Sequence, residues 1–142
     1  MSTRLRSFRF CCRASIAVEF ALVLPLFLLI VFGVVIFGSY LAVVHGVQQL
    51  AAEAARSSIA GLTDAERGAL ARAYVDSSAN SYPLIAPERL TIESGSSPGN
   101  TDVYVVTVGY DASPMFIYAL PSFVPVPPSQ IRRAAAIQRG GY

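Results

Sequence analysis

The chain has no lysine and carries little charge of either sign. Its 142 residues include eleven basic residues, all of them arginine, and nine acidic residues, so the net charge is only +2. A nucleic-acid binder that works by neutralising many phosphates needs a larger basic excess. We therefore expect no nucleic-acid partner. The exclusive use of arginine is interpreted as genomic composition bias and not as a mechanism.

Cysteine and histidine side chains are also scarce. The two cysteines are Cys11 and Cys12, and the single histidine is His45. No thiol follows residue 12, so no disulfide can form in the later part of the chain. A zinc site built from histidine and cysteine is excluded there as well. With no nucleophile-elbow pattern and no glycine-rich phosphate loop, the sequence predicts no catalytic residues, no metal and no cofactor.

One long uncharged run dominates the first third of the chain. From Phe20 to Val44 no side chain is ionisable except the phenol of Tyr40. As a helix this run reaches roughly 37 Å, against a hydrocarbon core of about 30 Å. It is longer than the apolar part of a signal peptide, which has about 7–15 residues, and the chain is too small to bury it as a core helix. We expect one transmembrane helix over residues 15–44.

The residues that flank this run predict its orientation. Four arginines precede it with no acid among them, whereas Glu53 and Arg56 cancel after it. By the positive-inside rule the N-terminus is cytoplasmic and the rest lies outside, as in an inner-membrane-type protein. The predicted organisation is a basic cytoplasmic leader over 1–14, the membrane helix over 15–44 and an extracytoplasmic domain over 45–142. The four arginines are Arg4, Arg6, Arg9 and Arg13.

Two features inside the helix bear on its packing. Pro25 removes one backbone hydrogen bond and is expected to kink the helix, although a proline tolerated by lipid is also ordinary. Gly38, Ala42 and Gly46 recur at every fourth position and make a stripe of small residues on one face. Such a stripe lets another helix approach closely. A chance run of small residues is the alternative.

Glu19 is the most informative residue, because an acid is not needed at the start of a membrane anchor. A carboxylate at mid-bilayer costs about 2.5–3.5 kcal/mol on insertion scales, and less near the interface. One interpretation leaves Glu19 among the head groups or paired with Arg13. The other is that Glu19 binds a positive group on a partner at the membrane boundary.

The stretch Arg13–Pro25, RASIAVEFALVLP, resembles the N-terminal signature of TadE-like proteins. These are the minor pseudopilins of the tight-adherence (Tad/Flp) pilus system. The shared features are a small residue, four further residues, the pair Glu19-Phe20 and an apolar helix with an early proline, Pro25. The helix tail Ala51–Arg56 is also similar to the family's helix exit.

The resemblance implies a structural component of pilus assembly. Its partners would be the membrane, other pilins or pseudopilins, Tad assembly proteins and a prepilin peptidase. In that family the peptidase cuts so that the glutamate becomes the fifth residue, which places the cut between Ala14 and Ser15 and lets Glu19 meet the new N-terminal amine of a neighbouring subunit. Prepilins usually have glycine before the cut, so Ala14 departs from the pattern. An unprocessed single-pass anchor or scaffold of another envelope complex is the alternative.

The external part predicts a small α+β domain. The alanine- and glutamine-rich segment 45–60 continues the first helix, and Thr63 with Glu66 matches a capping box that starts a second helix over 64–78. The apolar face of this second helix is predicted from Leu70, Ala73 and Tyr74.

An antiparallel sheet of about three strands is predicted between residues 88 and 139. Leu90–Ser94 and Val103–Tyr110 are rich in strand-forming residues and should pair as a hairpin with a long loop. The alanine-rich segment 131–139 favours a helix by propensity, but similarity to TadE-like chains favours a closing strand, which we choose.

The segment Ala112–Pro128 is apolar and holds five prolines, so it cannot be a regular helix or a central strand throughout. Its large side chains need cover. They either pack across the domain's own small sheet or form an exposed patch that contacts the membrane surface or a partner.

Overall fold

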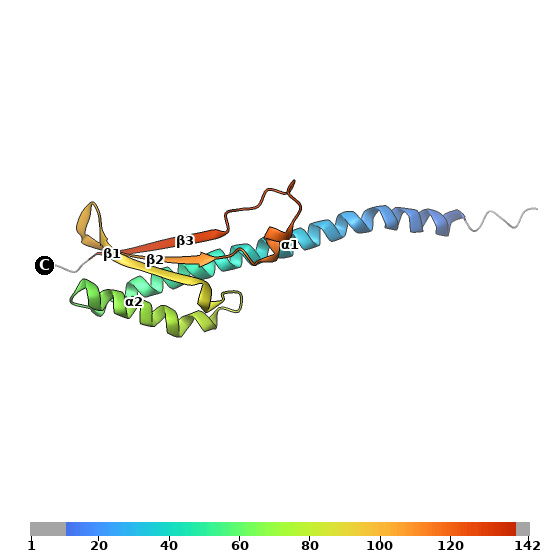
Figure 1. The fold of residues 1–142 in the computed structure, drawn as a ribbon. Coiled ribbons are helices and arrows are strands. Elements are labelled where there is room, and N and C mark those ends of the chain that lie inside the picture. Colours follow the sequence, from blue (N-terminus) through green and yellow to red (C-terminus); the bar gives the residue numbers. More distant parts are fainter. Residues whose placement is uncertain (1–10, 139–142) are drawn as a thin grey trace, which may run out of the picture. The chain divides into compact units, whose positions relative to one another are not determined.

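The computed structural model describes residues 11–138, with side chains described from Ile16 onward (Figure 1). Helix α1 runs from Cys11 to Ser57 and continues through Pro25. A short 3-10 helix, Ser58–Ala60, follows it, as expected for the segment 45–60. The chain divides into two compact units, one up to Phe37 and one from Gly38, so α1 contributes to both. Most of the predicted leader, residues 1–10, lies outside the described residues.

The second helix, α2, spans Asp64–Ser78 and confirms the predicted helix and its capping box. The Thr63 hydroxyl accepts a hydrogen bond from the Glu66 backbone N–H at 3.2 Å. In return, the Glu66 carboxylate accepts from the N–H groups of Leu62 at 2.9 Å and Thr63 at 3.2 Å. Three backbone donors at the start of the helix, which have no partner within the helix itself, are thereby paired.

The prediction of the apolar face of α2 was partly wrong. Leu70 is 38% exposed and Ala73 is also exposed, whereas Ala71 and Val75 are buried in the core. Tyr74 packs against that core as predicted. Ala71 and Val75 lie four residues apart on one face of α2, and that face, not the one with Leu70, meets the core.

Three antiparallel strands complete the α+β fold that the sequence predicts. They are β1 (Leu90–Ser97), β2 (Asn100–Asp111) and β3 (Gln130–Gln138), in the order β1-β2-β3. The closing strand is confirmed: β3 pairs with β2 along its whole length and buries Ile131. Backbone pairing with a formed neighbour outweighs the helix propensity of three consecutive alanines.

The predicted long hairpin loop was wrong. Only Pro98 and Gly99 separate β1 from β2, and the pairing continues through the polar residues before and after them. The register shifts between Ser96 and Ser97: the partner on β2 moves from Tyr104 to Asn100, so residues 101–103 have no partner on β1. Polar, glycine-containing residues join the ladder because pairing satisfies their backbone groups.

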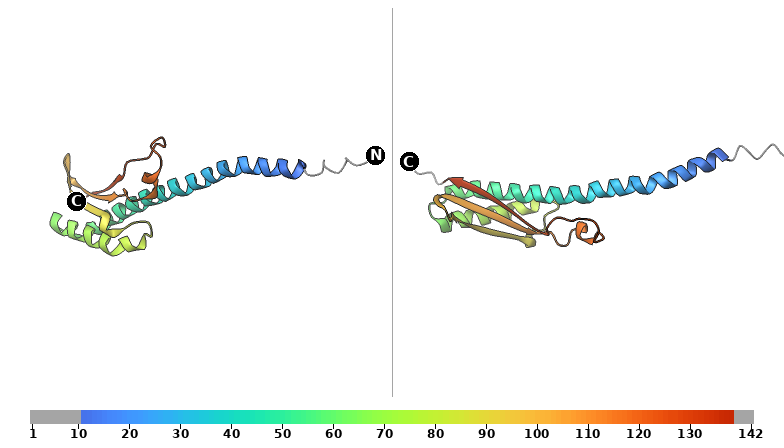
Figure 2. Two further views of the ribbon diagram at one scale, coloured as in Figure 1. Left: turned by 45° about the vertical axis from the view of Figure 1, so that its right-hand side comes forward. Right: turned by 90° about the horizontal axis from the view of Figure 1, so that it is seen from above.

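The core lies between one face of the sheet and the two helices. Figures 1 and 2 show α2 beside the C-terminal part of α1, with the sheet against both. On β2 the buried residues alternate, Tyr104, Val106 and Val108, as expected when one face of a strand is covered. The buried positions of α1 recur at three- and four-residue spacing and include Val43, Val47, Leu50, Ala51, Ala54 and Ala55.

For the proline-rich segment, the sequence left open whether its side chains pack on the domain or form an exposed patch, and each alternative holds for part of it. Phe116–Ala119 forms a 3-10 turn in which Ile117 is 1% exposed, and Met115 and Tyr118 pack against the core. Phe123, in contrast, is 83% exposed. Part of this segment therefore packs on the domain and part faces outward.

Candidate assembly site on helix α1

The N-terminal part of α1 presents a continuous apolar surface. Every side chain described from Ile16 to Phe32 is exposed, and the first buried side chain along the described helix is Val43. The helix is long and apolar enough to cross a membrane, and none of its most apolar window is buried. The chain's own described residues therefore give this surface no cover. Lipid or other helices would have to supply that cover.

Glu19 lies on this surface within a mainly apolar hollow. Ile16, Glu19, Phe20 and Val23 line it together. Their spacing of three, four and seven residues places all four side chains on one face of the helix. Burial of the apolar neighbours by lipid or by a second helix would also remove water from around the carboxylate, which strengthens its attraction to a cation.

The predicted processing site lies in the first turns of α1. Ala14 and Ser15 fall within the helix Cys11–Ser57. Their side chains and that of Arg13 lie outside the side chains described, so the predicted cut and the alternative Glu19–Arg13 pair stay predictions. Ser15 and Glu19 are four residues apart, about one helical turn, so both lie on the same side of the helix.

The other two signature residues lie on the exposed part of α1. Phe20 is 62% exposed and shares the hollow with Glu19. Pro25 lies inside the helix, and the helix is assigned without a break on either side of it. A proline has no backbone N–H, so the carbonyl four residues earlier, that of Ala21, loses its usual helical donor.

The stripe of small residues is divided by the fold. A β-carbon added to Gly38 would meet nothing within 4 Å, and Ala42 is exposed. Gly46 is buried, and a β-carbon there would lie 2.8 Å from Ile85 Cδ1 and 3.2 Å from Tyr82 Cδ1. The domain's own loop occupies the Gly46 end of the stripe, so only Gly38 and Ala42 face outward.

A hydrogen-bonded junction that the sequence did not predict ties α1 to the proline-rich segment. The hydroxyl of Tyr40 donates to the carbonyl of Pro128 at 3.2 Å, and the hydroxyl of Tyr118 donates to the same carbonyl at 2.9 Å. The only sequence signal was the presence of two tyrosines in otherwise apolar stretches. A tyrosine there needs a partner for its hydroxyl.

The base of the proline-rich segment is closed by Asp111. Its carboxylate accepts from the backbone N–H and the hydroxyl of Ser113 and from the side-chain amide of Gln130. Donation from Ser113 lowers the pKa of the Asp111 carboxyl below its usual value, and Gln130 adds to the effect. The Ala112 N–H also donates to the Ser129 carbonyl at 2.8 Å. Both ends of the segment are therefore held together.

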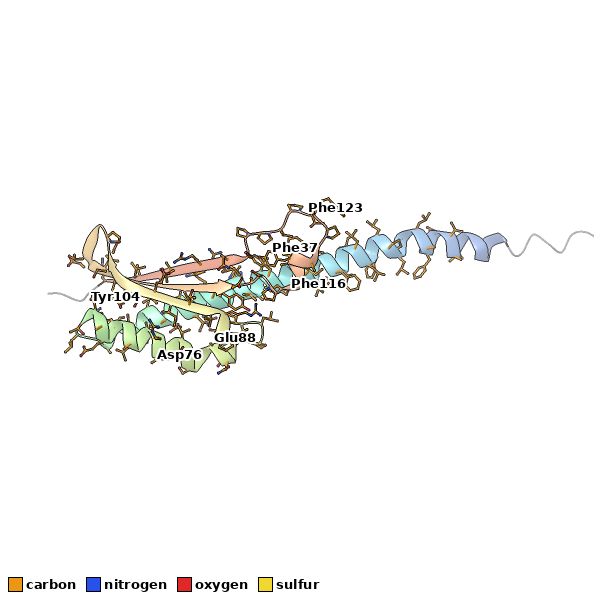
Figure 3. All side chains as sticks on the ribbon, in the orientation of Figure 1. Phe37, Asp76, Glu88, Tyr104, Phe116 and Phe123 are labelled. Carbon is orange, nitrogen blue, oxygen red and sulfur yellow. The ribbon has the colours of Figure 1, made fainter. Side chains whose placement is uncertain are left out.

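Among the residues that the structure describes, no group of three histidine, cysteine, aspartate or glutamate side chains could hold a metal ion. Arg67 lies over the ring of Tyr104 at 5.8 Å, and the Tyr104 hydroxyl donates to the carbonyl of Asp64. Figure 3 shows Tyr104 between the sheet and α2, where these contacts join the two. They are structural.

Comparison with known protein families matches residues 14–56 to the family described as TadE-like protein. The match begins at Ala14, includes Glu19, Phe20 and Pro25, and ends at Arg56. It confirms the resemblance stated from the sequence over this segment. No curated protein and no solved structure matches the chain.

Proposed function

We propose, from the TadE-like segment at residues 14–56, that the chain is a membrane-anchored, pseudopilin-like structural component in the assembly of a Tad/Flp-type pilus. One observation carries the proposal. The family match coincides with a helix whose apolar side chains from Ile16 to Phe32 are all exposed, while the rest of the chain builds its core without them. Such a helix is suited to membrane insertion and to lateral packing with other helices.

In the proposed topology the basic N-terminus is cytoplasmic and the domain from residue 45 onward is extracytoplasmic, in the bacterial inner membrane. The four arginines before Ser15 support this orientation, because positive residues are retained on the cytoplasmic side. On the other side, Glu53 and Arg56 form a surface ion pair at 3.1 Å and add no net charge.

In the proposed mechanism a prepilin peptidase cuts between Ala14 and Ser15. The Ser15 amine of one subunit then pairs with the Glu19 carboxylate of a neighbour. The apolar side chains around Glu19 favour this pairing once lipid or a neighbouring helix covers them, because two opposite charges in a region of low dielectric stabilise each other where either alone would be unfavourable. The exposed Gly38 and Ala42 would allow close approach of the neighbouring helix farther along.

The test is complementation of a deletion strain with Glu19→Gln, which keeps the size of the side chain and removes its charge. The proposal predicts normal membrane insertion and loss of pilus assembly. The matched control is Glu53→Gln on the same helix, which removes only a surface ion pair worth about 0–1 kcal/mol and should leave assembly intact. Piliated cells with Glu19→Gln would contradict the proposed role.

A second candidate function is an unprocessed single-pass anchor or scaffold of another envelope complex. Ala14 favours it, because a glycine usually precedes the cut in prepilins. Under this alternative, deletion of the gene leaves pili unaffected and Glu19→Gln has no effect on assembly. Pilus formation in the deletion strain therefore separates the two candidates.

A further inference from the structure

The segment between β2 and β3 has a composition unlike the rest of the external domain. From Ala112 to Gln130 it contains no charged side chain. Phe123 is 83% exposed, Phe116 is 69% exposed and Val126 is 42% exposed. Figure 3 shows both phenylalanines on this segment. We call it the apolar loop, and its exposed side chains need a partner surface.

The apolar loop is fixed to α1 at Tyr40. Tyr40 and Tyr118 donate to one carbonyl, that of Pro128. A carbonyl oxygen has two lone pairs, so it can accept both hydroxyls. Burial of Ile117 and the bonds of Asp111 at the base hold the rest of the loop on the domain. The Pro128 end of the loop therefore lies at the level of Tyr40 on the helix.

Tyr40 marks the outer end of the membrane-crossing part of α1. The twenty residues from Phe20 to Ser39 span about 30 Å as a helix, which equals the thickness of the hydrocarbon core. With Glu19 at the cytoplasmic boundary of the hydrocarbon, as in the proposed mechanism, Tyr40 reaches the opposite interface, where tyrosine is enriched. Burial of α1 side chains begins just beyond, at Val43. In the proposed topology the hydrocarbon therefore ends near Tyr40, so the last residues of the predicted membrane segment 15–44 already pack into the domain.

We infer that the apolar loop inserts Phe116, Phe123 and Val126 into the outer interface of the lipid bilayer in which α1 is anchored. The inference rests on the proposed membrane topology. The prolines suit this location, because proline has no backbone N–H and leaves fewer donors to satisfy away from water. The absence of charge in the loop also fits, because binding then depends on apolar contact and not on anionic lipid.

The test uses single tryptophan reporters, because the chain contains no tryptophan. The full-length protein is reconstituted into phosphatidylcholine vesicles whose lipids are brominated high on the acyl chain or near its end. Phe123→Trp should lose about half of its emission to lipids brominated high on the chain, since an interfacial apolar group lies roughly 5–10 Å deep. It should also be shielded from iodide, and adding anionic lipid should change neither result.

Two matched variants calibrate the measurement. Leu62→Trp replaces a side chain that is 90% exposed on the connection to α2, and it should be quenched by iodide but not by brominated lipid. Leu29→Trp replaces a side chain in the middle of the apolar run that is 69% exposed, and it should be quenched most by lipids brominated near the chain end. Equal thermal unfolding of the variants shows that each is folded.

Each remaining outcome overturns the inference in a distinguishable way. Iodide quenching of Phe123→Trp equal to that of Leu62→Trp shows a loop in water. Shielding from iodide without quenching by brominated lipid shows that protein covers the loop, as a second copy of the chain would. If Leu29→Trp is not quenched by brominated lipid, the proposed membrane anchor fails, and the inference fails with it.

Discussion

Ile85 lies directly against the backbone of Gly46, so that a β-carbon at position 46 would lie 2.8 Å from Ile85 Cδ1. This contact joins the last part of α1 to the loop that precedes β1. It explains why one glycine of the small-residue stripe is buried while Gly38, eight residues earlier, has open space around it. The two glycines therefore have different roles on one helix.

Substituting these two glycines should have different effects on the stability of the unit from Gly38 onward. Gly46→Leu forces Ile85 and Tyr82 to move and should lower the free energy of unfolding by about 1–3 kcal/mol, as overpacking does, less the gain of about 1 kcal/mol in helix propensity. Gly38→Leu should leave the free energy of unfolding unchanged or slightly raise the midpoint of the unfolding transition. Near-ultraviolet circular dichroism of the buried tyrosines in detergent follows the transition. Equal midpoints for the two variants would contradict the assigned contact.

The capping box of α2 predicts a pH dependence. Hydrogen bonds from the backbone N–H groups of Leu62 and Thr63 lower the pKa of Glu66 below its ordinary value of 4.5. The folded state thus favours the charged carboxylate, and its stabilising contribution is complete above pH 4.5 and is lost as the pH falls through the lower, folded-state pKa. Glu66→Gln should therefore lower the free energy of unfolding at neutral pH. The difference in the free energy of unfolding between this variant and the unsubstituted protein should become smaller in acid.

Thr63→Ala is the matched control for this experiment. It removes the neutral acceptor of the same capping box and should cost about 1 kcal/mol. Most of this cost should remain in acid, because the Thr63 hydroxyl contributes least to the lowering of the Glu66 pKa. If Glu66→Gln lowers the free energy of unfolding by the same amount at neutral pH and below pH 4.5, the role assigned to the carboxylate is contradicted.

The proposed topology predicts a pattern of thiol labelling. In cells without the prepilin peptidase, a membrane-impermeant maleimide should not label Cys11 or Cys12 until the membrane is opened. A variant that lacks both cysteines and carries Gly99→Cys should be labelled in spheroplasts. Gly99 lies in the turn between β1 and β2, and a β-carbon there meets nothing within 4 Å. Labelling of Cys11 or Cys12 in sealed spheroplasts would show the opposite orientation and contradict the proposed topology.

Local features of this chain could be predicted from the sequence, and non-local ones could not. The capping box of α2 depends on residues three positions apart, so Thr63 and Glu66 identified it. On β2, buried and exposed side chains alternate because only one face of the strand is covered. The Tyr40–Pro128 hydrogen bond joins residues 88 positions apart and depends on the assembled fold. Gly46 was assigned to the stripe by spacing alone, since nothing near it in sequence indicates Ile85.

In the candidate site, too, local features could be predicted from the sequence and non-local ones could not. Glu19, Phe20 and Pro25 could be selected because their signature is contiguous and belongs to a TadE-like segment. The face that Glu19 shares with Ile16 and Val23 follows from helical spacing. The apolar loop was left open between packing and exposure, because five prolines exclude regular structure without specifying which side chains face the domain. Only the fold separates buried Ile117 from exposed Phe123.

The most direct test of the assembly role is the N-terminal sequence of the protein purified from membranes of cells that contain the prepilin peptidase. Mass spectrometry should find a chain that begins at Ser15 and lacks both Cys11 and Cys12. Ala14→Leu should block this processing and leave Cys11 and Cys12 in the purified chain. A native protein that retains both cysteines when the peptidase is present would contradict the account, because Glu19 would then have no processed amine to meet.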